Sequence, residues 1–188
     1  MMSSSSFQGE LVRLSVEDPQ IFAEAFVHWN QDSLYYRLLD TDPPRLWSIK
    51  KIKMWVENDL EPGTPEEIQF GIRTLGHDEL IGFVSLDGIN WVDHNCYVAI
   101  GIGDRDFWGK GYGTDAMRLM LRYGFGQLNL HRMSLTVFAY NSRAIYSYEK
   151  CGFKHEGRIR EFILRDGIRS DMLHMGILRK DWDLLANK

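Results

Sequence analysis

The chain has 188 residues, of which 44% are hydrophobic and 13% aromatic, and it carries a formal net charge of -4 at pH 7. This length and apolar content suit one packed core, so we expect a single domain over residues 1–188, with a mobile start at 1–9 that contains the serine run 3–6. The slight acidity argues against sequence-independent binding to nucleic acid, and no apolar stretch of about 18 residues is present to span a membrane.

The first part of the chain predicts one strand and two helices. An extended run at 11–14 is followed by Asp18, an N-cap with proline at the first helical position, and by apolar residues at helical spacing over 19–30. The pattern over 31–47 is irregular. A second helix is expected to follow over 48–59, and it begins with a serine cap.

The next part predicts an antiparallel meander. Turn residues at 61–65 precede a strand with alternating apolar residues at 68–72. A hairpin loop at 76–79 joins it to a strand at 80–86, and a further strand follows at 96–102.

The second half alternates helices and strands after a glycine-rich loop. We expect a helix over 114–125, a strand over 133–139 and a helix over 142–150. Strands then flank a turn at 165–167, and a short helical tail begins at Asp181. This order predicts a mixed α/β sheet.

The loop 104–114 is the segment most informative about chemistry. It lies between an apolar strand and an amphipathic helix, and its glycines let the backbone approach a ligand closely. The exposed N–H groups at the start of a helix favour negative charge, so the loop predicts a phosphate-bearing ligand. A glycine-rich surface loop without a ligand is the alternative.

Two well-known phosphate loops do not match this segment. The ATP-binding pattern fails because Lys110 is followed by Gly111 instead of Ser or Thr, and because the preceding glycine spacing is one residue too long. The dinucleotide pattern fails because Asp106 stands where its third glycine is needed.

A second segment, 141–153, together with this loop closely resembles the GNAT acetyltransferases. The family pattern Q/R-x-x-G-x-G/A matches Trp108 through Gly113, with tryptophan first, as in the branch that contains ribosomal-protein N-terminal acetyltransferases. The resemblance is strongest over 96–178 and weakest before Ile68, where the family forms much of its acceptor pocket. It implies a mostly antiparallel central sheet, flanked by helices and splayed between its central strands.

The resemblance also implies acetyl-CoA as cosubstrate. Backbone N–H groups of 108–114 would hold the pyrophosphate, and the strand at 100–102 would splay from 133–139 to pair with pantetheine and the acetyl carbonyl. Asn141 would contact pantetheine or order the loop, although it could merely cap the following helix. The residues implied for the cosubstrate are Ile100, Gly101, Ile102, Trp108, Gly109, Lys110, Gly111, Tyr112, Gly113, Thr114, Asn141, Ala144 and Tyr146.

Tyr148 matches the family tyrosine whose hydroxyl faces the leaving sulfur. A phenol with a pKa of about 10 stays protonated at pH 7 and can donate a proton to the departing thiolate. Tyr146, two positions earlier, is the alternative. Cys151, before a glycine at a helix end, is better explained by packing than as an acetyl-carrying nucleophile.

The general base is not singled out by the sequence. Tyr97 stands where many relatives carry a glutamate. Weak candidates are Asp87, Asp93, Glu67 and Asp171, and ordered water is another route.

The predicted activity is direct attack of a neutral primary amine on the acetyl thioester, with backbone N–H near Ile102 polarising the carbonyl. The acceptor would be a protein N-terminus, a polyamine, an aminoglycoside or another small amine, and acidic residues in the first half favour a cationic one. An acetyl-CoA-binding sensor or scaffold without turnover is the alternative function.

Further expectations concern the environment of the chain. We expect neither nucleic acid nor a membrane as a partner, and the Trp-rich segments could cover the interface of a homodimer. The only cysteines, Cys96 and Cys151, form no C-x-x-C pair and no secretory signal is present, so we expect the reducing cytoplasm. His94 with Cys96 is far below a metal signature, and we expect no metal.

Overall fold

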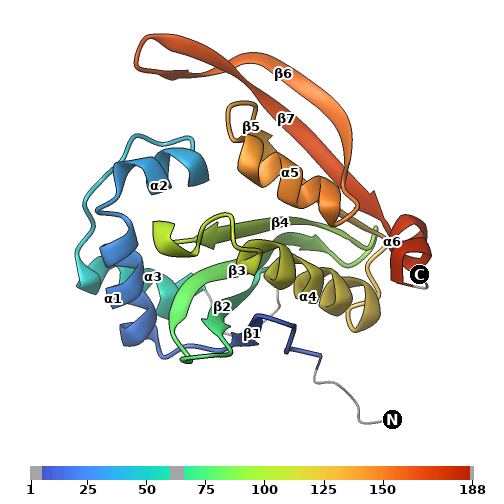
Figure 1. The fold of residues 1–188 in the computed structure, drawn as a ribbon, viewed down its shortest axis with the longest axis horizontal. Helices are drawn as coiled ribbons and strands as arrows, with labels where there is room; N and C mark the ends of the chain where they lie inside the picture. Colours follow the sequence, from blue (N-terminus) through green and yellow to red (C-terminus); the bar gives the residue numbers. More distant parts are fainter. Residues whose placement is uncertain (1–5, 60–65, 187–188) are drawn as a thin grey trace.

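The computed structural model describes residues 6–59 and 66–186 (Figure 1). The turn predicted at 61–65 lies outside them, as do the first five residues. Residues 7–9 of the predicted mobile start are hydrogen-bonded to the first strand: the amide of Leu14 donates to the Phe7 carbonyl and the amide of Gly9 to the Val12 carbonyl, each at 2.8 Å. The Phe7 ring also packs on Phe70, which anchors this segment.

One seven-stranded sheet organises the molecule in the order β1-β2-β3-β4-β5-β7-β6. Every neighbouring pair is antiparallel except β4 and β5, which are parallel. The predicted mixed, mostly antiparallel sheet is therefore confirmed. The strands are β1 (Val12–Ser15), β2 (Ile68–Thr74), β3 (Leu80–Asn90), β4 (Asn95–Ile102), β5 (Arg132–Phe138), β6 (Lys154–Arg165) and β7 (Ile168–Leu178).

The predicted helices form within a few residues of their expected ends, and the structure adds a helix that the sequence pattern did not predict. This helix, α2, is only seven residues long, too short to show a helical period; Asp32 caps it by accepting the Leu34 amide at 2.9 Å. The helices are α1 (Pro19–Trp29), α2 (Ser33–Leu39), α3 (Ile49–Asp59), α4 (Tyr112–Gly126), α5 (Ser142–Lys150) and α6 (Arg179–Ala186), with a short 3₁₀ helix, η1, at Arg105–Phe107.

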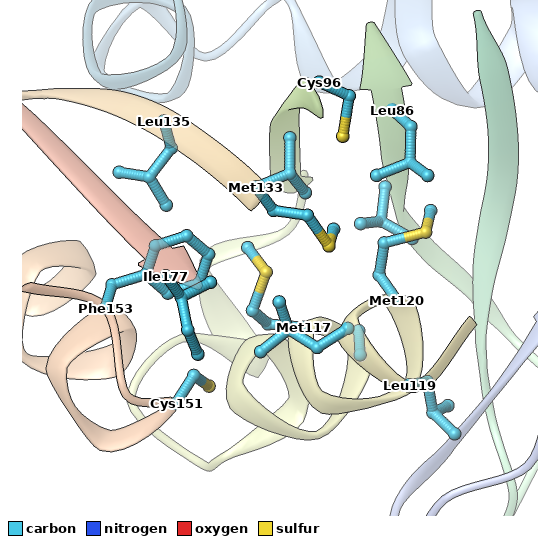
Figure 2. Packing of buried hydrophobic residues seen from close by; sticks show 14 of the residues in the cluster. Leu86, Cys96, Met117, Leu119, Met120, Met133, Leu135, Cys151, Phe153 and Ile177 are labelled. Atoms are coloured by element: carbon cyan, nitrogen blue, oxygen red, sulfur yellow. The ribbon is translucent and has the colours of Figure 1, made fainter. Parts of the chain in front are cut away.

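Two apolar clusters cover the two faces of the sheet. The larger one fills the space between the sheet and α4, where Met117 and Met120 meet Leu86 and Met133 (Figure 2). The smaller one packs α1 and α3 against the opposite face, through residues such as Phe22 and Phe83.

Candidate active site

The cleft begins where β4 and β5 separate. Their pairing runs only from Asn95 opposite Arg132 to Tyr97 opposite Ser134, so the predicted splay is confirmed. Hydrogen bonds alternate in direction along an antiparallel strand, and the Gly103 amide donates to the Ile81 carbonyl of β3 at 2.8 Å. The peptide groups of Ile100 and Ile102 therefore face away from β3, into the gap.

Two adjoining cavities occupy this gap. The first, here the loop cavity, extends from the splay to the glycine loop and α5, and the second, the sheet cavity, lies between the diverging strands. Ile100, Asn141 and Tyr148 line both, and so join them. The predicted site residues that line the loop cavity are Ile100, Gly101, Ile102, Trp108, Gly109, Gly111, Gly113, Thr114, Asn141, Ala144, Tyr146 and Tyr148.

The lining of the loop cavity does not include two of the predicted residues. Lys110 is exposed, and Tyr112 begins α4 and packs its ring against Phe107 at 5.3 Å. Neither side chain therefore forms part of the cavity wall.

The glycine loop depends on two left-handed positions. Gly109 has a φ of 72° and Gly111 a φ of 94°, conformations that other residues adopt only with strain. Gly111 is the N-cap of α4 and has no side chain to satisfy the first amides of the helix. These amides lie at the loop cavity, where a phosphate group can accept their hydrogen bonds.

Trp108 fastens this loop to β4. Its indole N–H donates to the Ile102 carbonyl at 2.7 Å, and the Arg143 guanidinium lies 3.7 Å from its ring centroid. Partial burial lowers the pKa of Arg143, and its charge would gain from a nearby anion. The tryptophan thus places a cation beside the loop as well as holding it.

The sequence analysis missed three polar side chains of α5 that line the loop cavity. They are Arg143, Ser147 and Lys150. Their spacing of four and then three residues puts them on one face of a helix, which is the signal that would have found them.

The structure shows the helix-capping role that was weighed for Asn141, and its contact with pantetheine stays a prediction. Its side chain caps α5 by accepting the Ala144 amide at 3.3 Å, and it also lines both cavities. The cap holds the helix start, and with it Tyr148, at the junction.

The two candidate tyrosines lie in different surroundings. Tyr148 lines both cavities, and burial raises the pKa of its hydroxyl to about 12. Tyr146 is 60% exposed, and the Lys150 amine lies 4.4 Å from its ring centroid. Tyr148 is therefore the tyrosine at the junction.

Among the candidate bases, Asp87 is the one that lines the sheet cavity, together with Tyr97 opposite it on β4. Burial raises the pKa of this carboxyl, although the Ser85 hydroxyl donates to it at 3.2 Å. Asp93 accepts from the Asn90 side chain in an exposed turn. The lining of neither cavity includes Asp93, Glu67 or Asp171.

The described residues also bear on the cysteine, metal and membrane hypotheses. Burial raises the pKa of the Cys151 thiol to about 11, and its sulfur donates to the Thr114 carbonyl at 3.7 Å, which is a packing role. The part of the chain with described side chains contains no cluster of three or more metal-binding groups. Within the same part, each helix is too short or too polar to cross a bilayer.

The chain is similar to characterised acetyltransferases. The domain family described as acetyltransferase (GNAT) domain matches residues 10–154. A spermidine N(1)-acetyltransferase of Escherichia coli (strain K12) is 34% identical over 158 residues, which are 81% of this chain and 83% of the relative. The crystal structure of spermidine N-acetyltransferase from Vibrio cholerae in complex with CoA and spermine superposes with a TM-score of 0.76 at 26% identity, over 91% of this chain and 97% of that one.

A relative of the branch suggested by Trp108 is also present. The ribosomal protein uS5 alanine N-acetyltransferase of Escherichia coli (strain K12) is 26% identical over 114 residues, which are 60% of this chain and 58% of the relative. For eight of the curated relatives, the matched part is between 56% and 83% of the relative's own length.

Proposed function

The chain belongs to the GNAT family of acetyl-CoA-dependent N-acetyltransferases, and from this premise we propose that the two cavities are its active site, with the cosubstrate in the loop cavity and the acceptor amine in the sheet cavity. One observation carries this proposal. The groups suited to a phosphate lie at one end, carboxylates lie at the other, and Tyr148 stands where the two cavities join.

The loop cavity fits acetyl-CoA in its chemistry. The α4 amides at Gly111, with the cations of Arg143 and Lys150, suit the phosphates. The peptide groups of Ile100 and Ile102 face the gap, where amides of a pantetheine arm can pair with them. The Ile102 carbonyl already accepts from Trp108, which leaves its N–H as the group that can bind the cosubstrate.

The proposed reaction is direct transfer from thioester to amine. Asp87 accepts a proton from the acceptor ammonium, the neutral amine attacks the acetyl carbon, and Tyr148 donates its proton to the departing thiolate. The raised pKa of Tyr148 keeps this hydroxyl protonated at neutral pH. The raised pKa of Asp87 makes it a better proton acceptor than an exposed aspartate.

We propose a small cationic amine such as a polyamine as the acceptor. The sheet cavity is lined by two carboxylates, Asp40 and Asp87, which favour a substrate with more than one positive charge. The spermidine acetyltransferases among the relatives support this choice over a protein N-terminus. We also propose a reducing cytoplasmic location, which agrees with the free thiols of Cys96 and Cys151. The homodimer stays a prediction, and a measurement of the native mass would test it.

The test combines acetyl-CoA binding by calorimetry with thiol release across polyamines, aminoglycosides and N-terminal peptides. We expect binding, turnover with polyamines, and a fall in kcat of about 10²- to 10⁴-fold in Tyr148→Phe. Tyr123→Phe, a tyrosine of α4 that packs on Phe70 outside both cavities, is the control. Binding without turnover of any amine would instead support a sensor, and loss of turnover in Tyr146→Phe alone would move the acid to Tyr146.

A further inference from the structure

Tyr35 of α2 carries a buried hydroxyl with no hydrogen-bond partner among the described residues. The residue is 3% exposed, and its ring is part of the wall of the loop cavity. Buried hydroxyls are almost always paired, because an unpaired one loses its bonds to water and gains nothing. The unpaired Tyr35 hydroxyl is therefore suited to form a hydrogen bond with a bound ligand.

The hydroxyl lies directly against β4 at Gly101. A Cβ atom at this position would lie only 2.7 Å from the Tyr35 oxygen, so the approach requires glycine. Along β4, Ala99 lines the sheet cavity, Ile100 lines both cavities, and Gly101 lines the loop cavity. Tyr35 is thus one residue to the cosubstrate side of the junction where thioester and amine have to meet.

We propose that the Tyr35 hydroxyl donates a hydrogen bond to the acyl carbonyl oxygen of the bound thioester, and so polarises the carbon that the amine attacks. This inference rests on the proposed function. It assigns the carbonyl oxygen a side-chain donor besides the backbone N–H at Ile102.

Tyr35 keeps its proton throughout the reaction. The C–N bond forms and the C–S bond breaks, while Asp87 receives the proton of the amine and Tyr148 supplies the proton of the thiol. Burial raises the pKa of the Tyr35 hydroxyl, so it remains a donor at neutral and moderately alkaline pH.

The experiment compares two ligands in Tyr35→Phe, because CoA has no acyl carbonyl and acetyl-CoA has one. We measure the Kd of each by calorimetry, kcat with the best amine, and the melting temperature without ligand. We expect acetyl-CoA to bind roughly three- to tenfold more weakly while the Kd of CoA changes less than about twofold, and kcat to fall by about tenfold. The melting temperature should rise or stay equal, since an unpaired buried hydroxyl has been removed.

Tyr36→Phe is the matched control, since Tyr36 lies next to Tyr35 on α2 but lines neither cavity. It should keep the ratio of the two Kd values and should not raise the melting temperature.

Several results would overturn the inference. Equal weakening of CoA and acetyl-CoA in Tyr35→Phe would place the hydroxyl on the pantetheine arm, and an unchanged ratio with unchanged kcat would show that it binds neither. A destabilised or unfolded Tyr35→Phe would show that the hydroxyl already has a partner in the free protein. If the unaltered protein bound neither ligand, the proposed function itself would fail, and the inference with it.

Discussion

At the scale of single residues, the role that we propose for a side chain depends on which cavity it lines. Tyr97 is 52% exposed and stands where, by the family resemblance, many relatives carry a glutamate, so the proposed base has to come from another residue. Asp87 is the direct cross-strand neighbour of Tyr97, and its carboxylate lines the same cavity. The proposed base on β3 therefore lies beside the Tyr97 position of β4, because directly paired residues of neighbouring strands lie side by side.

Asp87→Asn tests the proposal that Asp87 is the general base. A base works only when it is deprotonated, and burial raises the pKa of Asp87, so activity should fall on the acidic side at a higher pH than for an exposed aspartate. The amide cannot titrate, so the variant should lose this acidic limb and about 10² in kcat/KM at neutral pH. The check is kcat/KM as a function of pH in both proteins.

Asp93→Asn is the control for Asp87→Asn, since Asp93 lies in the exposed turn after β3. It should leave the pH profile as it is. An acidic limb that persists in Asp87→Asn would assign the base to ordered water or to another group.

At the scale of elements, helix α4 is fixed at its N-terminal end by the start of the chain. Asp115, in its first turn, is 7% exposed and accepts two backbone amides, those of Leu11 at 2.8 Å and Val12 at 3.1 Å. Its negative charge also lies at the favourable end of the helix dipole. The glycine loop immediately before α4 is thereby tied to the edge strand β1.

Asp115→Ala should destabilise the protein by about 2 kcal/mol, because it leaves two partly or fully buried amides without their acceptor. Asp115→Asn keeps one acceptor oxygen and should cost less. Denaturant unfolding followed by circular dichroism measures both. Equal stability of the alanine variant and the parent would show that water replaces the carboxylate.

At the scale of the whole molecule, the β6–β7 hairpin reaches across the gap between β4 and β5 and contacts the segment at the end of α2. Its tip reaches the side of the molecule where α2 lies (Figure 1), and Arg165 donates there to the carbonyls of Asp40, Thr41 and Asp42 at 2.9 to 3.0 Å. Arg37 of α2 also pairs with Asp166 of the hairpin turn. These bonds join the hairpin to residues 37–42, and they hold the segment that walls the sheet cavity.

Arg165→Ala should loosen this wall. We expect the KM for the amine to rise by about tenfold, since several charge-assisted bonds are lost, while the Kd of CoA changes little because the glycine loop is untouched. Arg169→Ala is the control: this arginine is also near the hairpin tip, but it donates to the Glu161 carbonyl within the hairpin. Steady-state kinetics and calorimetry decide, and an unchanged amine KM in Arg165→Ala would contradict the role of the hairpin.

The tryptophans serve the interior of the molecule more than its surface. Trp29 is 4% exposed, and Trp47, Trp55 and Trp108 pack against the same smaller cluster. Trp91 is 41% exposed. The predicted homodimer interface therefore gains no support from most of the Trp-rich segments.

The local sequence alone determined the elements whose signals lie within a few residues. Asp18 and Asn141 cap α1 and α5 as their positions predicted, and glycines occur where the loop needs left-handed backbone, at Gly109 and Gly111. Caps and turns depend on backbone chemistry between near neighbours, so a linear pattern is enough to find them. The phosphate loop and its helix could be read in this way before any contact was known.

Only the tertiary structure decided which polar groups meet at the junction. Helix α2 was not predicted, and with it the sequence analysis missed Tyr35, whose unpaired hydroxyl depends on contact with Gly101 far along the chain. The same holds for the position of Asp87, the one of the four candidate carboxylates that lines the sheet cavity, and for the stacking of Arg143 on Trp108. Burial and pairing between residues that are distant in sequence arise only when the sheet and its helices pack together. Local propensity therefore cannot predict them.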